Sequence, residues 1–118
     1  MATNKQTGIK GEELAAVYLQ NKGYTILERN WRFKRWEVDI IASQGNFLHF
    51  FEIKTRTSSR FGHPEESIGQ AKMNNLRNAA EEYQYQHPEW KYIQFNVLAI
   101  TMQYNQPAEF FLIEDVYF

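Results

Sequence analysis

The sequence predicts an α/β (α+β) domain in which a central mixed β-sheet is flanked by helices. Two segments have the apolar periodicity of helices, and five have the composition or alternation of strands, in the order α-β-β-β-α-β-β. The chain has 118 residues, which fits a single domain spanning residues 1–118 with a core that needs no disulfide. A helix packed on each face of the sheet would bury the apolar sides of these elements.

The two helices are predicted from apolar side chains that recur three and four residues apart. The first covers residues 8–22, and Gly23 ends it. The second covers residues 67–86 and begins with Ser67 and Gln70, which have the form of a capping box. His87-Pro88 follows the second helix, and the residue before a proline disfavours helical geometry.

Aromatic and β-branched residues, in part alternating with polar ones, mark the strands. We expect strands at residues 24–32, 36–43, 47–55, 92–101 and 108–113. A short link containing glycine joins the second strand to the third, so these two should form an antiparallel hairpin. The fourth strand is apolar along most of its length, as in a strand buried on both faces.

Composition excludes several classes of site. The chain contains no cysteine, which rules out disulfides, thiolate metal sites and cysteine nucleophiles. Its N-terminal segment lacks the apolar centre of a signal peptide, and no apolar run approaches the roughly 18 residues of a membrane span. We therefore expect a cytoplasmic protein with no membrane partner.

The charges are unevenly distributed although the net charge is only -1. Between positions 29 and 60 there are seven lysines and arginines and three acids, whereas Lys91 is the only lysine or arginine after Asn78. The basic residues are Arg29, Arg32, Lys34, Arg35, Lys54, Arg56 and Arg60. This pattern predicts a basic end and an acidic end, with ordinary solvated surface charge as an equally good interpretation.

The third strand carries the clearest chemical pattern. Strand alternation places Glu52 and Lys54 on one face, and the hairpin can bring Asp39 opposite them, on the face that we expect it to share with Glu37 and Ile41. Two carboxylates can bind Mg²⁺ or Mn²⁺, and the ammonium can act on a water or a phosphate beside the metal. A chance cross-strand ion pair is the alternative, but the apolar neighbours of both carboxylates favour a bound cation.

Several motifs together resemble one protein family from about Gly8 to Ala99. They are Gly8-x-x-Gly11-Glu12, Tyr18-Leu19, Gly23-Tyr24, Asn30, Glu37-Val38-Asp39-Ile40-Ile41, Phe51-Glu52-Ile53-Lys54-Thr55-Arg56 and Lys72. The pattern resembles the YraN family, which is similar to archaeal Holliday junction resolvases and to the restriction-endonuclease-like superfamily. The resemblance implies a metal-dependent endonuclease that acts on structured or branched DNA in repair or recombination. A non-catalytic module that binds nucleic acid or protein is the alternative.

The resemblance also implies roles for individual residues. Asp39 and Glu52 would be metal ligands, Lys54 the lysine of the signature, and Glu12 an acid on the first helix that also serves the metal. Glu12 lies at the edge of the apolar helix face, whereas Glu13 points away from it. Asn96 departs from the pattern, because related sequences often have an acid there, and Val38 stands in place of a proline.

Nucleic acid is expected to dock along a basic surface. Its candidate residues are Arg29, Arg32, Lys34, Arg35, Arg56, Arg60 and Lys72. For Lys72 two interpretations stay open, an ammonium that extends toward the acidic site or a side chain that fills the helix edge. The oligomeric state is also open, with a homodimer among the alternatives.

Other polar and aromatic residues are assigned structural roles. We expect Glu37 to support the site or to pair with an arginine rather than to catalyse. Core packing is favoured over base stacking for Trp31, Trp36 and Phe61. The three histidines, His49, His63 and His87, lack the spacing of a zinc site.

Overall fold

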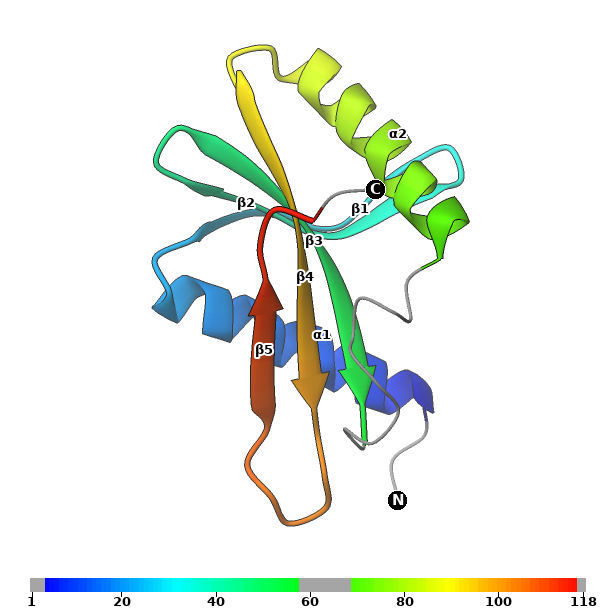
Figure 1. The fold of residues 1–118 in the computed structure, drawn as a ribbon, viewed down its shortest axis with the longest axis vertical. Coiled ribbons are helices and arrows are strands. Elements are labelled where there is room, and N and C mark those ends of the chain that lie inside the picture. Colours follow the sequence, from blue (N-terminus) through cyan, green and yellow to red (C-terminus); the bar gives the residue numbers. More distant parts are fainter. Residues whose placement is uncertain (1–3, 58–68, 117–118) are drawn as a thin grey trace.

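A computed structural model describes residues 4–57 and 69–116, with side-chain positions from residue 8 onward. The predicted order α-β-β-β-α-β-β is confirmed, and Figure 1 shows its arrangement. The elements are α1 (Asn4–Asn21), β1 (Thr25–Phe33), β2 (Trp36–Gln44), β3 (Phe47–Arg56), α2 (Gln70–Gln86), β4 (Tyr92–Thr101) and β5 (Glu109–Ile113). The strands form one mixed sheet in the order β1-β2-β3-β4-β5, in which β3 and β4 are parallel and the other neighbours antiparallel. This is compatible with the expected compact nuclease-like fold.

Helix α1 begins earlier than predicted and ends where predicted. The polar residues before Gly8 lack an apolar pattern, but residues such as lysine and glutamine favour the helix, which extends back to Asn4. At the other end Gly23 has a φ of 94°. Its N–H donates to Gln20, and the N–H of Tyr24 donates to the carbonyl of Leu19, a hydrogen-bond pattern that closes many helices.

Helix α2 begins three residues later than predicted. Gly69 occupies the N-cap position in an extended conformation, without a side-chain cap, and Gln70 is the first helical residue. The capping box expected from Ser67 and Gln70 is therefore not the cap of this helix, and Ser67 itself lies outside the described residues. Neither described helix is long and apolar enough to cross a membrane.

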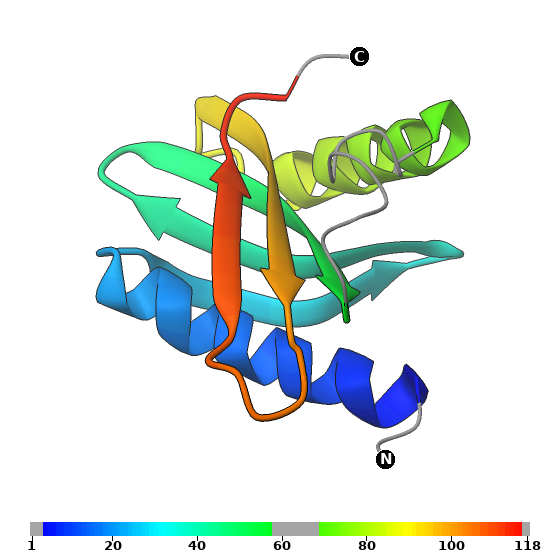
Figure 2. The ribbon, with the colours of Figure 1, turned by 60° about the horizontal axis from the view of Figure 1, so that its bottom comes forward.

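The two helices cover opposite faces of the sheet, as Figure 2 shows. On one face, Leu19 of α1 packs in a cluster with Ile40, Phe51 and Ile53 of the sheet. On the other, side chains of α2 pack with Val38, Ile41, Leu48 and Phe50. Strand β3 therefore alternates as predicted, with Phe50 toward α2 and Phe51 toward α1.

The alternation of β2 is interrupted, contrary to prediction. Val38 and Ile41 lie three residues apart yet both pack toward α2, so Asp39 does not simply share the face of Ile41. The interruption coincides with Asn30 on β1, which has a φ of 53° and lies between the paired positions Arg29↔Ile40 and Trp31↔Val38. A residue in this left-handed conformation changes the course of a strand, so both strands switch faces here.

Strands β2 and β3 separate at the same place. Their pairing runs from Gln44↔Phe47 to Ile40↔Phe51 and ends there. Beyond it, the β1–β2 hairpin projects in one direction while the end of β3 runs in another beside β4 (Figure 1). We call this divergence the fork, defined by Asp39 on β2 and Glu52 on β3.

Candidate functional site

The Asp39 carboxylate lies at the fork and replaces the missing backbone pairing. Its Oδ2 accepts a hydrogen bond of 2.9 Å from the backbone N–H of Ile53. A side chain thus occupies the place where the next ladder contact between β2 and β3 would lie. The prediction that hairpin pairing brings Asp39 to the Glu52–Lys54 segment is correct in outcome, although the strand geometry differs.

Glu52 is buried on the α2 side of β3, with 4% of its surface exposed. Its Oε1 lies 2.5 Å from the Nζ of Lys72 in the first turns of α2. Lys72 remains 51% exposed at its side chain, so it reaches inward from the protein surface. Two interpretations were open for Lys72, and the structure confirms the one in which its ammonium extends toward the acidic site.

The two carboxylates repel each other. Burial and the negative charge of Glu52 raise the pKa of Asp39 to about 7, and Glu12 contributes in the same direction, whereas the hydrogen bond from Ile53 and the charge of Lys72 oppose the shift. Burial lowers the pKa of Lys72, but its hydrogen bond and charge interaction with Glu52, together with Asp39 and Glu37, raise it above the ordinary value. One lysine therefore only partly compensates this acidic cluster.

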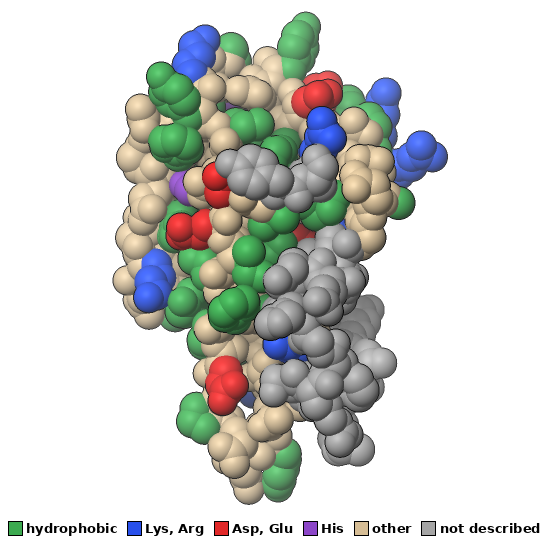
Figure 3. All heavy atoms as spheres, viewed as in Figure 1, with side chains coloured by type: hydrophobic (Ala, Val, Ile, Leu, Met, Phe, Trp, Pro, Cys, Tyr) green, Lys and Arg blue, Asp and Glu red, His purple; other side chains and the backbone are tan. Residues whose placement is uncertain are grey.

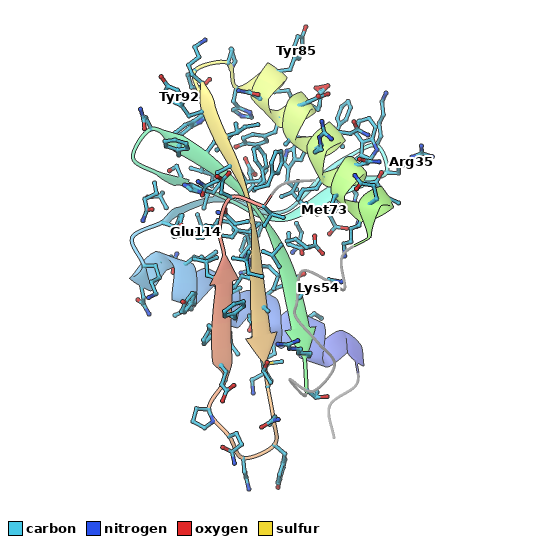
Figure 4. The ribbon with its side chains drawn as sticks, in the orientation of Figure 1. Arg35, Lys54, Met73, Tyr85, Tyr92 and Glu114 are labelled. Carbon is cyan, nitrogen blue, oxygen red and sulfur yellow. The ribbon has the colours of Figure 1, made fainter. Side chains whose placement is uncertain are left out.

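Lys54 follows Glu52 on β3 and is half-buried. Figure 4 labels it on β3. Among the described residues it makes no ion pair, in contrast to Lys72. Within residues 4–57 and 69–116, its ammonium is thus not committed to a carboxylate.

Helix α1 approaches the site through a glycine. A Cβ placed on the buried Gly11 would overlap the Oγ1 of Thr55 and lie 3.0 Å from its Cγ2, so only glycine permits this contact between α1 and β3. The next residue, Glu12, is half-buried while Glu13 is exposed, as the helix geometry predicted. The close packing at Gly11 thus explains why Glu12 is near enough to affect the pKa of Asp39.

The donor chemistry fits a hard divalent cation. Asp39 and Glu52 supply two carboxylates in a setting with unbalanced negative charge. In the described part of the chain, no three Asp, Glu or His side chains are arranged to hold a metal ion, so Glu12 is near the pair without closing a three-residue site. Mg²⁺ is commonly held by one or two carboxylates and completes its shell with water and substrate phosphate oxygens. Asp39 and Glu52 could hold it in that way.

The predicted basic residues fall on both arms of the fork. Arg29, Arg32, Lys34 and Arg35 are exposed on the β1–β2 hairpin, and Figure 3 shows Lys and Arg side chains on the right-hand edge, where the hairpin projects. Arg56 is half-buried at the end of β3, where its Nε donates to the Oγ1 of Thr101. Arg60 lies outside the described residues.

Glu37 has the arginine partner expected of it. Its Oε2 lies 2.9 Å from Arg32, with 38% and 67% of the two side chains exposed. Trp31 and Trp36 both pack against the α2-side cluster, in agreement with core packing. Phe61 and His63 lie outside the described residues.

The position of Asn96 belongs to a different cluster. This residue is fully buried on β4, and its amide nitrogen lies 2.9 Å from Nδ1 of His49, while its oxygen accepts the N–H of Asp115. Asn96 is therefore a structural hydrogen-bonding residue on β4. His49 faces away from Glu52, as predicted, and takes no part in the fork.

The sequence left the extension of Lys72 toward the site as one of two interpretations without naming Glu52 as its partner, and it did not predict the left-handed Asn30. The position of Lys72 on the apolar stripe of its helix, between Ile68 and Leu76, was the signal for that extension. A charged residue on a buried stripe needs a buried partner, and Glu52 was the candidate. No comparable signal marks Asn30, because asparagine is common in exposed turns as well.

The chain is similar to a family described as "Uncharacterised protein family UPF0102", whose model matches residues 11–100. A UPF0102 protein of Syntrophomonas wolfei is 43% identical over 85% of this chain and 88% of its own length. One of Flavobacterium psychrophilum is 40% identical over 93% and 90%, and one of Rhodococcus opacus is 36% identical over 99% and 100%. The matched region includes every element of the fork.

Proposed function

This chain belongs to the UPF0102 family, and from that premise and the fork we propose that it is a metal-dependent endonuclease acting on structured or branched DNA in repair or recombination. The observation that carries the proposal is the pair of carboxylates, Asp39 and Glu52, held together where burial and the charge of Glu52 raise the pKa of Asp39 to about 7. Such a pair attracts a divalent cation, and its neighbour Lys54 makes no ion pair in the described part of the chain. We also propose a cytoplasmic location, with which the absence of cysteine is compatible.

Each residue of the fork has a defined task in this proposal. When bound, Mg²⁺ or Mn²⁺ polarises the phosphate and lowers the pKa of its water. Asp39 and Glu52 hold the cation, and the backbone N–H of Ile53 orients Asp39. Lys54 positions the attacking water and offsets the negative charge that develops on the phosphate. Lys72 holds Glu52 in place from α2.

Charge supports a DNA substrate. The Asp39–Glu52 pair would repel a phosphate backbone, but cations flank it on the hairpin and at the end of β3. Phosphate contacts on both arms would guide a DNA strand across the fork without reading its bases. Recognition should therefore depend on DNA shape, which is why we name structured or branched DNA as the substrate.

The test is a cleavage assay on branched and linear DNA with Mg²⁺, with Mn²⁺ and with EDTA. We expect metal-dependent cleavage by the wild type and a loss of about 100-fold or more in Lys54→Ala, with metal affinity and fold retained. Lys91→Ala, an exposed lysine far from the fork in sequence, is the matched control and should cleave normally. DNA binding without cleavage in either metal would instead establish the non-catalytic module.

A further inference from the structure

The tip of the β1–β2 hairpin combines aromatic rings with cations. Phe33 and Trp36 pair across the hairpin, and the two-residue turn Lys34-Arg35 joins them. Lys34 has a φ of 56°, an uncommon conformation for a lysine. Figure 4 shows Arg35 at the outer edge of the molecule. The tip therefore presents positive charge beside half-buried rings.

The rings form a short platform. Trp31 and Phe33 have nearly parallel planes, 11° apart, with centroids separated by 6.4 Å, and the centroid of Trp36 lies 6.2 Å from that of Phe33. The two tryptophans pack against the α2-side core and so anchor the platform. The Lys34 ammonium lies 5.5 Å from the Phe33 centroid and 5.9 Å from that of Trp36, in cation–π contact.

The hairpin also leads directly to the fork. Between Arg29 and Glu37 its only acid is Glu37, which is paired with Arg32, while Arg29, Lys34 and Arg35 are exposed. Asp39 lies three residues after Trp36 on β2, roughly 10 Å along the strand. A polymer bound at the tip would thus have its next units close to Asp39 and Glu52.

We propose that the hairpin tip binds an unpaired nucleotide, with its base stacked on the Phe33–Trp36 platform and its phosphate at Lys34 and Arg35. Aromatic rings stack on any base, and adjacent cations contact the backbone, which is the general chemistry of single-stranded nucleic acid binding. In a continuous duplex the bases are already stacked and paired, so the platform offers them little. The inference rests on the proposed function for its DNA substrate. It specifies that substrate as a duplex with an unpaired segment, which would lie beside Asp39 and Glu52 of the protein.

Binding in EDTA separates this inference from catalysis. The probes are a labelled duplex with a single-stranded tail, a blunt duplex of the same charge, and a single strand, measured by fluorescence anisotropy. We expect the wild type to bind the tailed duplex more tightly than the blunt one. Phe33→Leu removes the ring but keeps an apolar side chain, and it should weaken binding of the tailed duplex by roughly tenfold while leaving the blunt duplex unchanged.

Two controls define the effect. Phe33→Tyr retains the ring and should retain wild-type preference. Tyr85→Leu removes an aromatic ring that is 83% exposed near the end of α2 and should change nothing (Figure 4). If Phe33→Leu does not fold, Arg35→Glu at the exposed turn replaces it, and this variant should weaken the tailed duplex more than the blunt one.

The inference is overturned if the wild type binds blunt and tailed duplexes equally, or if the variants weaken both by the same factor. Either result would leave an acidic protein or a plain duplex as the partner of the hairpin. Cleavage without any tail preference would overturn this inference alone. Tail preference without cleavage in Mg²⁺ or Mn²⁺ would overturn the endonuclease and leave the inference standing.

Discussion

Two polar clusters lie on the sheet, and they differ in how their groups are balanced. One is the fork with Asp39, Glu52 and Lys72. The other, which we call the amide cluster, contains His49 and Asn96 with Asp115 beyond β5. In the amide cluster a neutral side-chain amide donates to one group and accepts from another, whereas in the fork two carboxylates share a single lysine.

The pKa values express this difference. Burial lowers the pKa of His49, although Glu114 and a hydrogen bond with Gln94 partly oppose it. Because the amide nitrogen of Asn96 can only donate, Nδ1 of His49 accepts, and the ring is neutral. In the fork, burial and the neighbouring charge of Glu52 raise the pKa of Asp39. A closed cluster stabilises the fold, whereas an unbalanced one attracts a cation.

The largest expected effect is on cleavage by the fork. Glu52→Gln keeps the shape of the side chain but removes a charged ligand, so we expect about 10³-fold slower metal-dependent cleavage. Isothermal titration should show weaker Mg²⁺ binding in the same variant. Glu13→Gln is the control, because Glu13 is exposed on α1. Unchanged metal affinity in Glu52→Gln would remove Glu52 from the metal site.

The amide cluster should affect stability and not cleavage. Asn96→Ala leaves Nδ1 of His49 and the N–H of Asp115 without the Asn96 side chain, at a cost of about 2–3 kcal/mol in the free energy of unfolding. Urea denaturation measures this loss. The exposed Asn75→Ala serves as the control and should change stability by less than about 0.5 kcal/mol. A selective loss of cleavage in Asn96→Ala would contradict the separation of the two clusters.

Removing Lys72 should make the fork depend on metal for stability. In Lys72→Met the buried Glu52 loses its partner, and because Lys72 is half exposed we expect a loss of only about 1–2 kcal/mol in EDTA. Saturating Mg²⁺ should restore most of this loss, since the cation replaces the ammonium. Lys91→Met is the matched control. Destabilisation that Mg²⁺ does not relieve would show that Lys72 and the cation occupy unrelated places.

The two clusters should respond to pH in opposite directions. The folded pKa of Asp39, about 7, lies above its ordinary value of 3.8. Between these pH values the folded state binds a proton that the unfolded state has lost, so the contribution of Asp39 to the free energy of unfolding falls as pH rises. The lowered pKa of His49 has the opposite sign, and its contribution is lost as pH falls below the ordinary value of 6.5.

Replacing Asp39 isolates the contribution of this carboxyl group to the pH dependence of stability. In EDTA, the stability of Asp39→Asn relative to wild type should increase by about 1 kcal/mol between about pH 5 and pH 8, because the variant has no carboxylate to ionise. Urea denaturation at each pH measures this difference. The control is Asp115→Asn, whose carboxyl lies beyond β5. A difference that is constant with pH would mean that Asp39 is ionised throughout this range.

Much of this molecule could be predicted because its signals are local. Alternation along β3 placed Glu52 and Lys54 on one face, and Gly23 ended α1, because strand and helix periodicity depend on neighbouring residues alone. The choice of Glu12 over Glu13 followed from the same helix geometry. The Gly45-Asn46 turn likewise made the β2–β3 hairpin predictable.

The sequence by itself determined which acids and lysines could meet, and the tertiary structure decided which of them do. Three features connect residues far apart in the chain. They are the hydrogen bond from Ile53 to Asp39 where β2 and β3 separate, the Lys72–Glu52 pair, and the hydrogen bonds of Asn96 with His49 and Asp115. Such contacts depend on how each helix packs on the sheet and on strand twist, which no local pattern encodes. The physical reason is that periodicity gives the direction of a side chain within its own element, whereas its partner is set by the packing of the whole fold.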